Sequence, residues 1–186
     1  SGLLPSTLYT VVVVTPGTTC SASYNITTGA ACCPGNPTLA NSGPVCAGSP
    51  VTLTTTLPVG ATATSYAWSG PAGSATTTNG SVTIPNMTPA KAGVYNVTVT
   101  YSNGCTGVAS TTVVVNPKPT ITSATASCVN GSGRITVVAT IAAPGSIATY
   151  SIPGTTNATG IFNGLSAGTY TVTVTSAAGC TKTTTV

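Results

Sequence analysis

Few side chains in this sequence could take part in a chemical reaction. Most reaction classes therefore have no catalytic group here. The 186 residues contain no Asp, Glu or His, and four cationic side chains give a net charge of +4. Proton transfer near neutral pH normally uses His, Asp or Glu, so Tyr and Cys remain as acids or nucleophiles with no side-chain base beside them. We therefore expect a protein that is not an enzyme and that acts through shape, surface and assembly. The four cations are Lys91, Lys118, Arg134 and Lys182.

The same absences exclude several kinds of site. Calcium sites and glycosidases need carboxylates, and a serine triad needs a histidine. The seven cysteines include no pair with C-x-x-C spacing and have no histidine to join them, so a zinc site is not expected. Four scattered cations form no basic patch for nucleic acid. No metal, cofactor or nucleic acid is predicted.

Composition indicates an all-β protein. The sequence is rich in Thr and Val, which favour strands, and poor in the usual helix formers. Its length allows one or two domains. Charged residues make up 2% of the chain, against about 25% in ordinary soluble domains. Because charges normally protect strand edges from association, we expect either assembly or solubilising glycans.

A repeated pattern marks two similar modules. Residues 93–105 read GVYNVTVTYSNGC and residues 168–180 read GTYTVTVTSAAGC. Apolar and polar residues alternate strictly in both, as in a half-buried strand that ends in a turn. A cysteine lies upstream of each copy, so we predict disulfides Cys46–Cys105 and Cys128–Cys180, each worth about 2–4 kcal/mol. Buried free thiols are the alternative.

The cysteines also indicate an oxidising, extracellular setting. The remaining three are Cys20, Cys32 and Cys33. Adjacent cysteines rarely bond to each other, so we expect Cys20 to pair with Cys32 or Cys33. The one left over either cross-links to another subunit or stays a free thiol.

The repeat divides the chain into three parts. A Pro-stiffened joint, Asn116-Pro117-Lys118-Pro119, separates a domain at 44–116 from a domain at 117–186. Residues 1–43 are expected to be a donor strand and a cysteine loop. We therefore predict two tandem Ig-like β-sandwich domains with an N-terminal extension strand.

Particular residues carry a family resemblance. In the first domain Cys46, Ser65-Tyr66-Ala67-Trp68, Ile84-Pro85-Asn86, Ala92-Gly93-Val94-Tyr95 and Gly104-Cys105 resemble Ig-like modules of secreted bacterial proteins. The resemblance implies that Tyr95 is a corner tyrosine and Trp68 a core tryptophan. Lys91 departs from it, because such corners usually have Asp at that position.

The second domain resembles the repeat of large gliding-motility adhesins. The residues that match are Cys128, Gly133-Arg134-Ile135-Thr136-Val137, Ile161-Phe162-Asn163-Gly164-Leu165, Ala167-Gly168-Thr169-Tyr170 and Gly179-Cys180. Both resemblances imply cell-surface stalks, adhesins and fibres rather than chemistry.

The two ends of the chain have complementary features. An apolar strand near the N-terminus has no early strands before it, and the last domain ends at Val186, soon after Cys180. We expect residues 3–15 of one subunit to complete the C-terminal domain of the next, which would build a homopolymeric filament. The alternative is a stalk segment of a larger modular adhesin. The assembly strand consists of Leu8, Tyr9, Val11, Val12, Val13 and Val14.

Sugars could be attached to this chain as glycans or could bind to it as ligands. Asn-x-Ser/Thr sequons begin at Asn25, Asn79, Asn86, Asn96, Asn130 and Asn157, and occupied sites would supply the solubility that charge does not. A carbohydrate-binding module is a third hypothesis. It would need exposed aromatic residues, for which Tyr24, Tyr66, Tyr101 and Tyr150 are the candidates. No apolar run approaches the roughly 18 residues of a membrane span.

Overall fold

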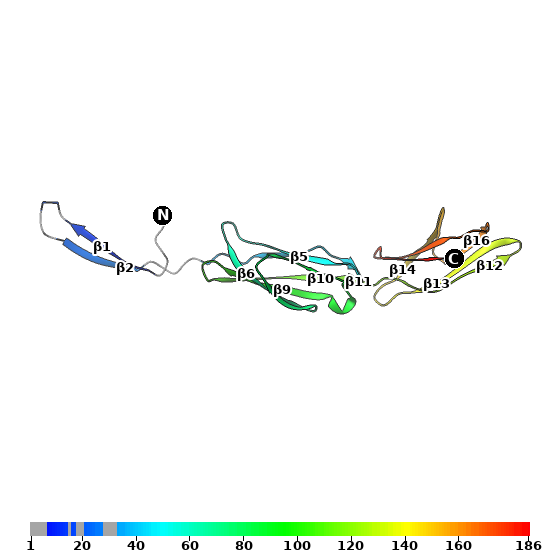
Figure 1. Ribbon diagram of the computed structural model, residues 1–186, viewed down its shortest axis with the longest axis horizontal. Helices are drawn as coiled ribbons and strands as arrows, with labels where there is room; N and C mark the ends of the chain where they lie inside the picture. The colour runs from blue at the N-terminus through cyan, green and yellow to red at the C-terminus, as the bar shows by residue number, and fades with distance from the viewer. Residues whose placement is uncertain (1–6, 15, 18–20, 28–32) are drawn as a thin grey trace.

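The computed structural model describes residues 7–14, 16–17, 21–27 and 33–186, which form a two-stranded sheet followed by two β-sandwiches (Figure 1). The described residues consist of strands and turns with one 3-10 helix, η1 (Pro89–Lys91). The prediction of an all-β chain with tandem Ig-like sandwiches is confirmed. The two-stranded sheet and the turn between β12 (Thr120–Val129) and β13 (Ser132–Thr140) lie at opposite ends of the molecule in Figure 1.

The first sandwich packs a three-stranded sheet against a four-stranded sheet. The sheets have the orders β3-β5-β8 and β10-β9-β6-β7, and a short parallel pair, β4–β11, closes one side. The strands are β3 (Thr38–Asn41), β4 (Val45–Cys46), β5 (Val51–Thr56), β6 (Ala63–Gly70), β7 (Gly73–Thr77), β8 (Ser81–Ile84), β9 (Gly93–Tyr101), β10 (Thr106–Val113) and β11 (Val115–Asn116). Because β3 pairs with β5, this sandwich begins before residue 44, the predicted start of the domain.

Alternation along the strands builds the core of the first sandwich. On β9, Tyr95, Val97 and Val99 are buried, whereas Val94 and Asn96 are exposed, as expected where successive side chains point to opposite faces of a sheet. Trp68 on β6 is also buried, and its indole N–H donates to Thr77 Oγ1 at 3.0 Å. The position of Trp68 agrees with the core tryptophan that the resemblance implied.

The second sandwich repeats this plan with a smaller core. Its sheets have the orders β12-β13-β16 and β15-β14-β17-β18. The further strands are β14 (Ile147–Ile152), β15 (Thr155–Asn157), β16 (Ile161–Leu165), β17 (Thr171–Ser176) and β18 (Thr181–Thr185). The buried core consists of Ile135, Val137, Tyr150, Ile152, Phe162, Val172 and Val174.

The disulfides differ from both predicted pairs. Cys33 bonds to Cys105 and Cys46 bonds to Cys180, each with Cα atoms 5.6 Å apart. The predicted pairs Cys46–Cys105 and Cys128–Cys180 are therefore wrong, and so is a Cys20–Cys33 bond. Cys128 is exposed and has no disulfide partner among the described residues. The pair Cys20–Cys32 lies outside the described residues.

The spatial order of the modules explains these pairs. Cys105 lies in the β9–β10 turn, at the end of the first sandwich where Asn36 accepts a hydrogen bond from the Val108 amide. Cys180 lies in the β17–β18 turn, at the joint with the first sandwich, and its sulfur is 3.8 Å from the Asn116 carbonyl oxygen. The first Gly-Cys turn is thus tied to the segment before its own sandwich, and the second Gly-Cys turn is tied to β4 of the preceding sandwich. The predictions kept each bond within one repeat.

Candidate assembly site

The predicted assembly strand has a partner within its own chain. β1 (Leu8–Val14) pairs with β2 (Ser21–Thr27) in an antiparallel two-stranded sheet. All of its residues except Tyr9 are exposed, including Val12 and Val14 at 54% and 59%. Residues 8–14 are therefore not the single, unpaired strand that the sequence analysis expected.

One face of this sheet is entirely apolar. The register places Tyr9 beside Ile26, Val11 beside Tyr24 and Val13 beside Ala22. Cross-strand partners share a face of a sheet, so the six side chains form one continuous surface, which we call the hairpin face. The opposite face alternates Leu8, Val12 and Val14 with Thr, Ser and Asn residues. Two strands cannot bury such a face by themselves.

The contribution of β2 was missed at the sequence level. The segment Ser-Ala-Ser-Tyr-Asn-Ile-Thr has the period-2 alternation of a strand, with Ala22, Tyr24 and Ile26 on one side. That alternation could have indicated the strand. Its many small polar residues and the nearby cysteines instead suggested a loop.

At the other end of the molecule, the second sandwich has an open edge. In the first sandwich the final strand, β11, pairs in parallel with β4. Just before β11, the Val114 carbonyl oxygen accepts a hydrogen bond from the Val45 amide at 3.1 Å. In the second sandwich β12 pairs only with β13, and β18 pairs only with β17. Among the described residues, no strand is hydrogen-bonded to the outer side of β18, although β12 of the other sheet lies close to it.

The hydrogen-bond pattern shows which backbone groups face this edge. Tyr170 and Val186 exchange two backbone hydrogen bonds at 2.8 and 2.9 Å, and the Ser176 amide donates to the Cys180 carbonyl oxygen at 2.8 Å. Bonded and non-bonded pairs alternate in an antiparallel ladder. The amides and carbonyls of Thr181, Thr183 and Thr185 therefore point away from β17, toward the open edge.

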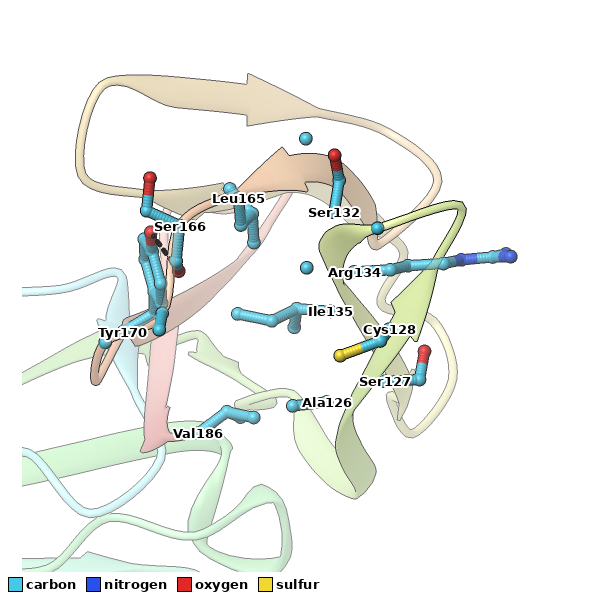
Figure 2. A pocket seen from close by; sticks show the side chains of 15 residues that line it. Ala126, Ser127, Cys128, Ser132, Arg134, Ile135, Leu165, Ser166, Tyr170 and Val186 are labelled. Atoms are coloured by element: carbon cyan, nitrogen blue, oxygen red, sulfur yellow. Dashed lines mark hydrogen bonds between the residues drawn. The ribbon is translucent and has the colours of Figure 1, made fainter.

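A cleft of about 590 Å³ lies beside this strand (Figure 2). Ala126, Ile135, Leu165, Tyr170 and Val186 supply its apolar lining. Serine side chains, Cys128 and Arg134 share the lining, so the cleft next to Val186 is apolar only in part.

Two polar side chains of the lining point in different directions. Figure 2 shows the sulfur of Cys128 on the cleft side of its strand and the guanidinium of Arg134 pointing away. The Arg134 Nε is buried and has no hydrogen-bond partner among the described residues. The Tyr170 hydroxyl donates to the Ser166 carbonyl oxygen at 3.1 Å, which fixes the loop at the mouth of the cleft.

The structure removes three candidates for carbohydrate binding. Tyr66 and Tyr150 are each 8% exposed, and Tyr101 is 1% exposed with its hydroxyl donating to the Gly35 carbonyl oxygen. The expectation that these side chains are exposed is wrong, because they belong to the two cores. Tyr24 is exposed, but it lies on the hairpin face.

The sequons occupy different environments. Asn79, Asn86, Asn96 and Asn130 are exposed. Asn25 is exposed on β2, and its Oδ1 accepts a hydrogen bond from Thr10. The Asn157 amide donates to the Ile161 carbonyl oxygen, and its Oδ1 accepts from the Gly160 amide at 2.8 Å. Asn157 therefore holds a turn and is the sequon least suited to carry a glycan.

The described residues contain no group of three or more side chains that could together bind a metal ion. Helices with the length and hydropathy needed to cross a membrane are likewise absent from those residues.

Comparisons with known proteins agree with the Ig-like fold. Residues 37–116 match the family model of the PKD domain. The N-terminal eight Ig domains of Down Syndrome Cell Adhesion Molecule superpose with a TM-score of 0.56 at 14% identity, covering 89% of this chain and 29% of that one. The chain thus spans less than a third of that structure. No curated protein matches it in sequence.

Two other solved structures have lower TM-scores. Murine CEACAM1b gives 0.44 at 16% identity, covering 81% of this chain and 96% of that one. Fibronectin(III)-like modules of Clostridium thermocellum CbhA give a TM-score of 0.40 at 18% identity, covering 80% of this chain and 91% of that one.

PKD and Ig-like domains are extracellular and typically non-enzymatic, and two disulfides fit a secreted protein. The chain is an all-β, Ig-like protein whose first sandwich is similar to the PKD domain.

Proposed function

We propose that this protein is a non-enzymatic structural subunit of an extracellular filament, assembled head-to-tail. In this proposal the β1–β2 sheet of one copy adds to the open edge of β18 in the next. The observation that supports it is the presence of two unsatisfied features: an exposed apolar face on β1–β2, and an edge of β18 that has no hydrogen-bonded neighbour and lies beside a partly apolar cleft.

The donor supplies both backbone and side-chain contacts. Among the described residues β1 pairs with β2 alone, so a further strand can add along its other edge. Strand addition gains affinity from main-chain hydrogen bonds and specificity from alternate side chains. With β1 against β18, the Tyr9, Val11 and Val13 side chains would lie over the cleft, and β2 would extend the same apolar surface.

The acceptor suits an uncharged donor. Residues 7–27 contain no charged side chain, so docking desolvates no ion on the donor. The Arg134 guanidinium points out of the cleft, so no charged group faces the Ile135, Leu165 and Val186 side chains from within the lining.

The geometry of such a contact favours a polymer. The donor lies at one end of the molecule, and the acceptor strand belongs to the sandwich at the other end (Figure 1). A heterologous contact of this kind forms an open filament unless its rotation closes a ring. The low charge of the chain removes the usual barrier to strand-edge association. Attached glycans would keep the remaining surface soluble.

Paired variants of the hairpin test the donor. The double variant Val11→Ser and Val13→Ser makes the hairpin face more polar. The double variant Val12→Ser and Val14→Ser makes the same two replacements on the opposite face and is the matched control. The wild type and the second variant should form filaments in electron micrographs. The first variant should run as a monomer in light scattering. Filaments that persist in the first variant would contradict the proposal.

A backbone variant tests the acceptor. Thr183→Pro removes an N–H that points to the open edge and leaves the β17–β18 hydrogen bonds in place. Thr183→Val keeps that N–H and is the matched control. We expect Thr183→Pro to abolish filaments and Thr183→Val to retain them. Equal assembly of the two variants would show that the β18 edge is not used.

A stalk segment of a larger modular adhesin is the second candidate. It is favoured by the covalent joint between the two sandwiches, where Cys46 bonds to Cys180. In that case a neighbouring module of the same polypeptide would cover β18. The purified chain would then appear as isolated rods, and none of the four variants would change its mass in solution.

A further inference from the structure

The Cys46–Cys180 disulfide closes a covalent loop that contains most of both sandwiches. The two cysteines are 134 positions apart in the sequence. Every strand from β5 to β17 lies within this loop, together with both hydrophobic cores. Outside the loop lie the segment before Cys46, which includes β3, and the segment after Cys180, which includes β18.

The bond bridges the joint between the modules. Cys46 on β4 pairs with Asn116 on β11, the last strand before the chain enters the second sandwich. The Cys180 sulfur lies 3.8 Å from the Asn116 carbonyl oxygen. The disulfide and the polypeptide link therefore cross the joint side by side. Cys180 is 1% exposed, which shields its sulfur from thiols in solution.

We propose that this chain is a tension-bearing segment in which a pulling force bypasses both hydrophobic cores through the Cys46–Cys180 bond. Force applied to the two ends follows the shortest covalent path. That path runs along the backbone to Cys46, across the disulfide to Cys180, and on to Val186. Residues 47–179 lie off this path, so breaking the hydrogen bonds that they make with one another cannot lengthen the molecule. The inference does not depend on filament assembly.

The second disulfide has a different mechanical role. Cys33 and Cys105 are 72 positions apart, whereas the backbone from Cys33 to Cys46 is much shorter. The Cys33–Cys105 bond therefore does not shorten the force path while Cys46–Cys180 is intact. It becomes part of the path only when Cys46–Cys180 is absent. This difference supplies an internal control.

Single-molecule stretching of the full chain from residues 1 and 186 tests the proposal. At about 3.5 Å per residue, full reduction of the wild type should add about 45 nm of contour length, because the 134 links inside the loop are released. The variant C46S/C180S is still limited by the Cys33–Cys105 bond. Without reductant, its contour length should exceed that of the oxidised wild type by only about 20 nm. The variant C33S/C105S should extend no further than the oxidised wild type.

The result that overturns the proposal is an oxidised wild type that lengthens by the same amount as the reduced protein. A gain in length for C33S/C105S would overturn it as well. Fluorescence of Trp68, the one tryptophan, shows whether each variant keeps its first core buried. If C46S/C180S does not fold, reductant added to folded wild type during stretching provides the same comparison.

Discussion

The Tyr95 hydroxyl donates a hydrogen bond to the Lys91 carbonyl oxygen at 2.7 Å, four residues upstream. This bond is the tyrosine corner that the Ig-like resemblance implied, and it forms although Lys91 stands where Asp is usual, because only the backbone carbonyl of residue 91 takes part. Tyr170 makes the equivalent bond to Ser166 at 3.1 Å in the second sandwich. The two modules thus share a corner as well as a strand pattern.

The two corners should differ in their contribution to stability. Tyr95 is 3% exposed, so Tyr95→Phe leaves the Lys91 carbonyl without its partner and should lower the free energy of unfolding by about 1 kcal/mol. The Tyr170–Ser166 bond is exposed, and water can replace it in Tyr170→Phe. Urea unfolding measures both changes. An equal or larger loss for Tyr170→Phe would contradict this account of the corners.

The stability of the protein should be nearly independent of pH in acid. No Asp, Glu or His side chain is present to titrate, so we expect a constant melting temperature between about pH 3 and pH 7. Thermal scans across that range check this expectation. A melting temperature that falls steeply below pH 5 would show that other titrating groups stabilise the fold.

Alkaline pH should destabilise the first sandwich. Burial raises the pKa of Tyr95, and burial together with neighbouring Tyr66 raises the pKa of Tyr101. Because the folded-state pKa values exceed the unfolded value of about 10, the stabilising contribution is complete below pH 10 and is lost as pH rises through the folded values. Trp68 fluorescence should therefore report unfolding at lower denaturant concentration above pH 10. An unchanged midpoint there would contradict the prediction.

Cys128 should react with thiol reagents in the native state. It is exposed, whereas Cys46 and Cys180 are joined in a disulfide. Iodoacetamide treatment of the folded protein, followed by peptide mapping, should label the Cys128 peptide without reductant. The peptides that contain Cys46 and Cys180 should be labelled only after reduction and unfolding. Labelling of Cys46 in the native, unreduced protein would show that the observed disulfide pairing is incorrect.

Glycans on the secreted protein should follow the environments of the sequons. Asn130 is exposed in the β12–β13 turn, and Asn79 is exposed beside β8, so both can accept a sugar without loss of packing. Asn157 uses both ends of its amide in the turn that precedes β16. Glycopeptide mapping should find sugar at Asn130 or Asn79 and none at Asn157. A glycan on Asn157 would contradict this reading of the turn.

Local patterns in the sequence were sufficient to predict the fold. The alternation of Tyr95, Val97 and Val99 with polar residues indicates a half-buried strand wherever it occurs, and its recurrence at Tyr170 indicates a second sandwich. The Ig-like resemblance placed Trp68 and Tyr95 correctly because their roles depend on neighbouring residues. These signals do not require knowledge of how distant segments meet.

The disulfides and the hairpin depended on distant contacts. The repeat made Cys46 and Cys105 equivalent to Cys128 and Cys180, but it contained no information on which ends of the two sandwiches adjoin. Likewise, the Val-rich strand at residues 11–14 suggested a donor without showing that Ser21–Thr27 pairs with it. The sequence did lead us to expect an incomplete last domain, but only the β17–β18 register shows which backbone groups of β18 face its open edge.

Amide hydrogen exchange at the β18 edge tests the assembly proposal most directly. The amides of Thr181, Thr183 and Thr185 point to the open edge, whereas the Thr184 amide faces β17 and serves as the internal control. In assembled wild type we predict slow exchange at all four positions. In the monomeric variant with Val11→Ser and Val13→Ser, only Thr184 should stay protected. Fast exchange at Thr183 in assembled material would contradict strand addition at β18.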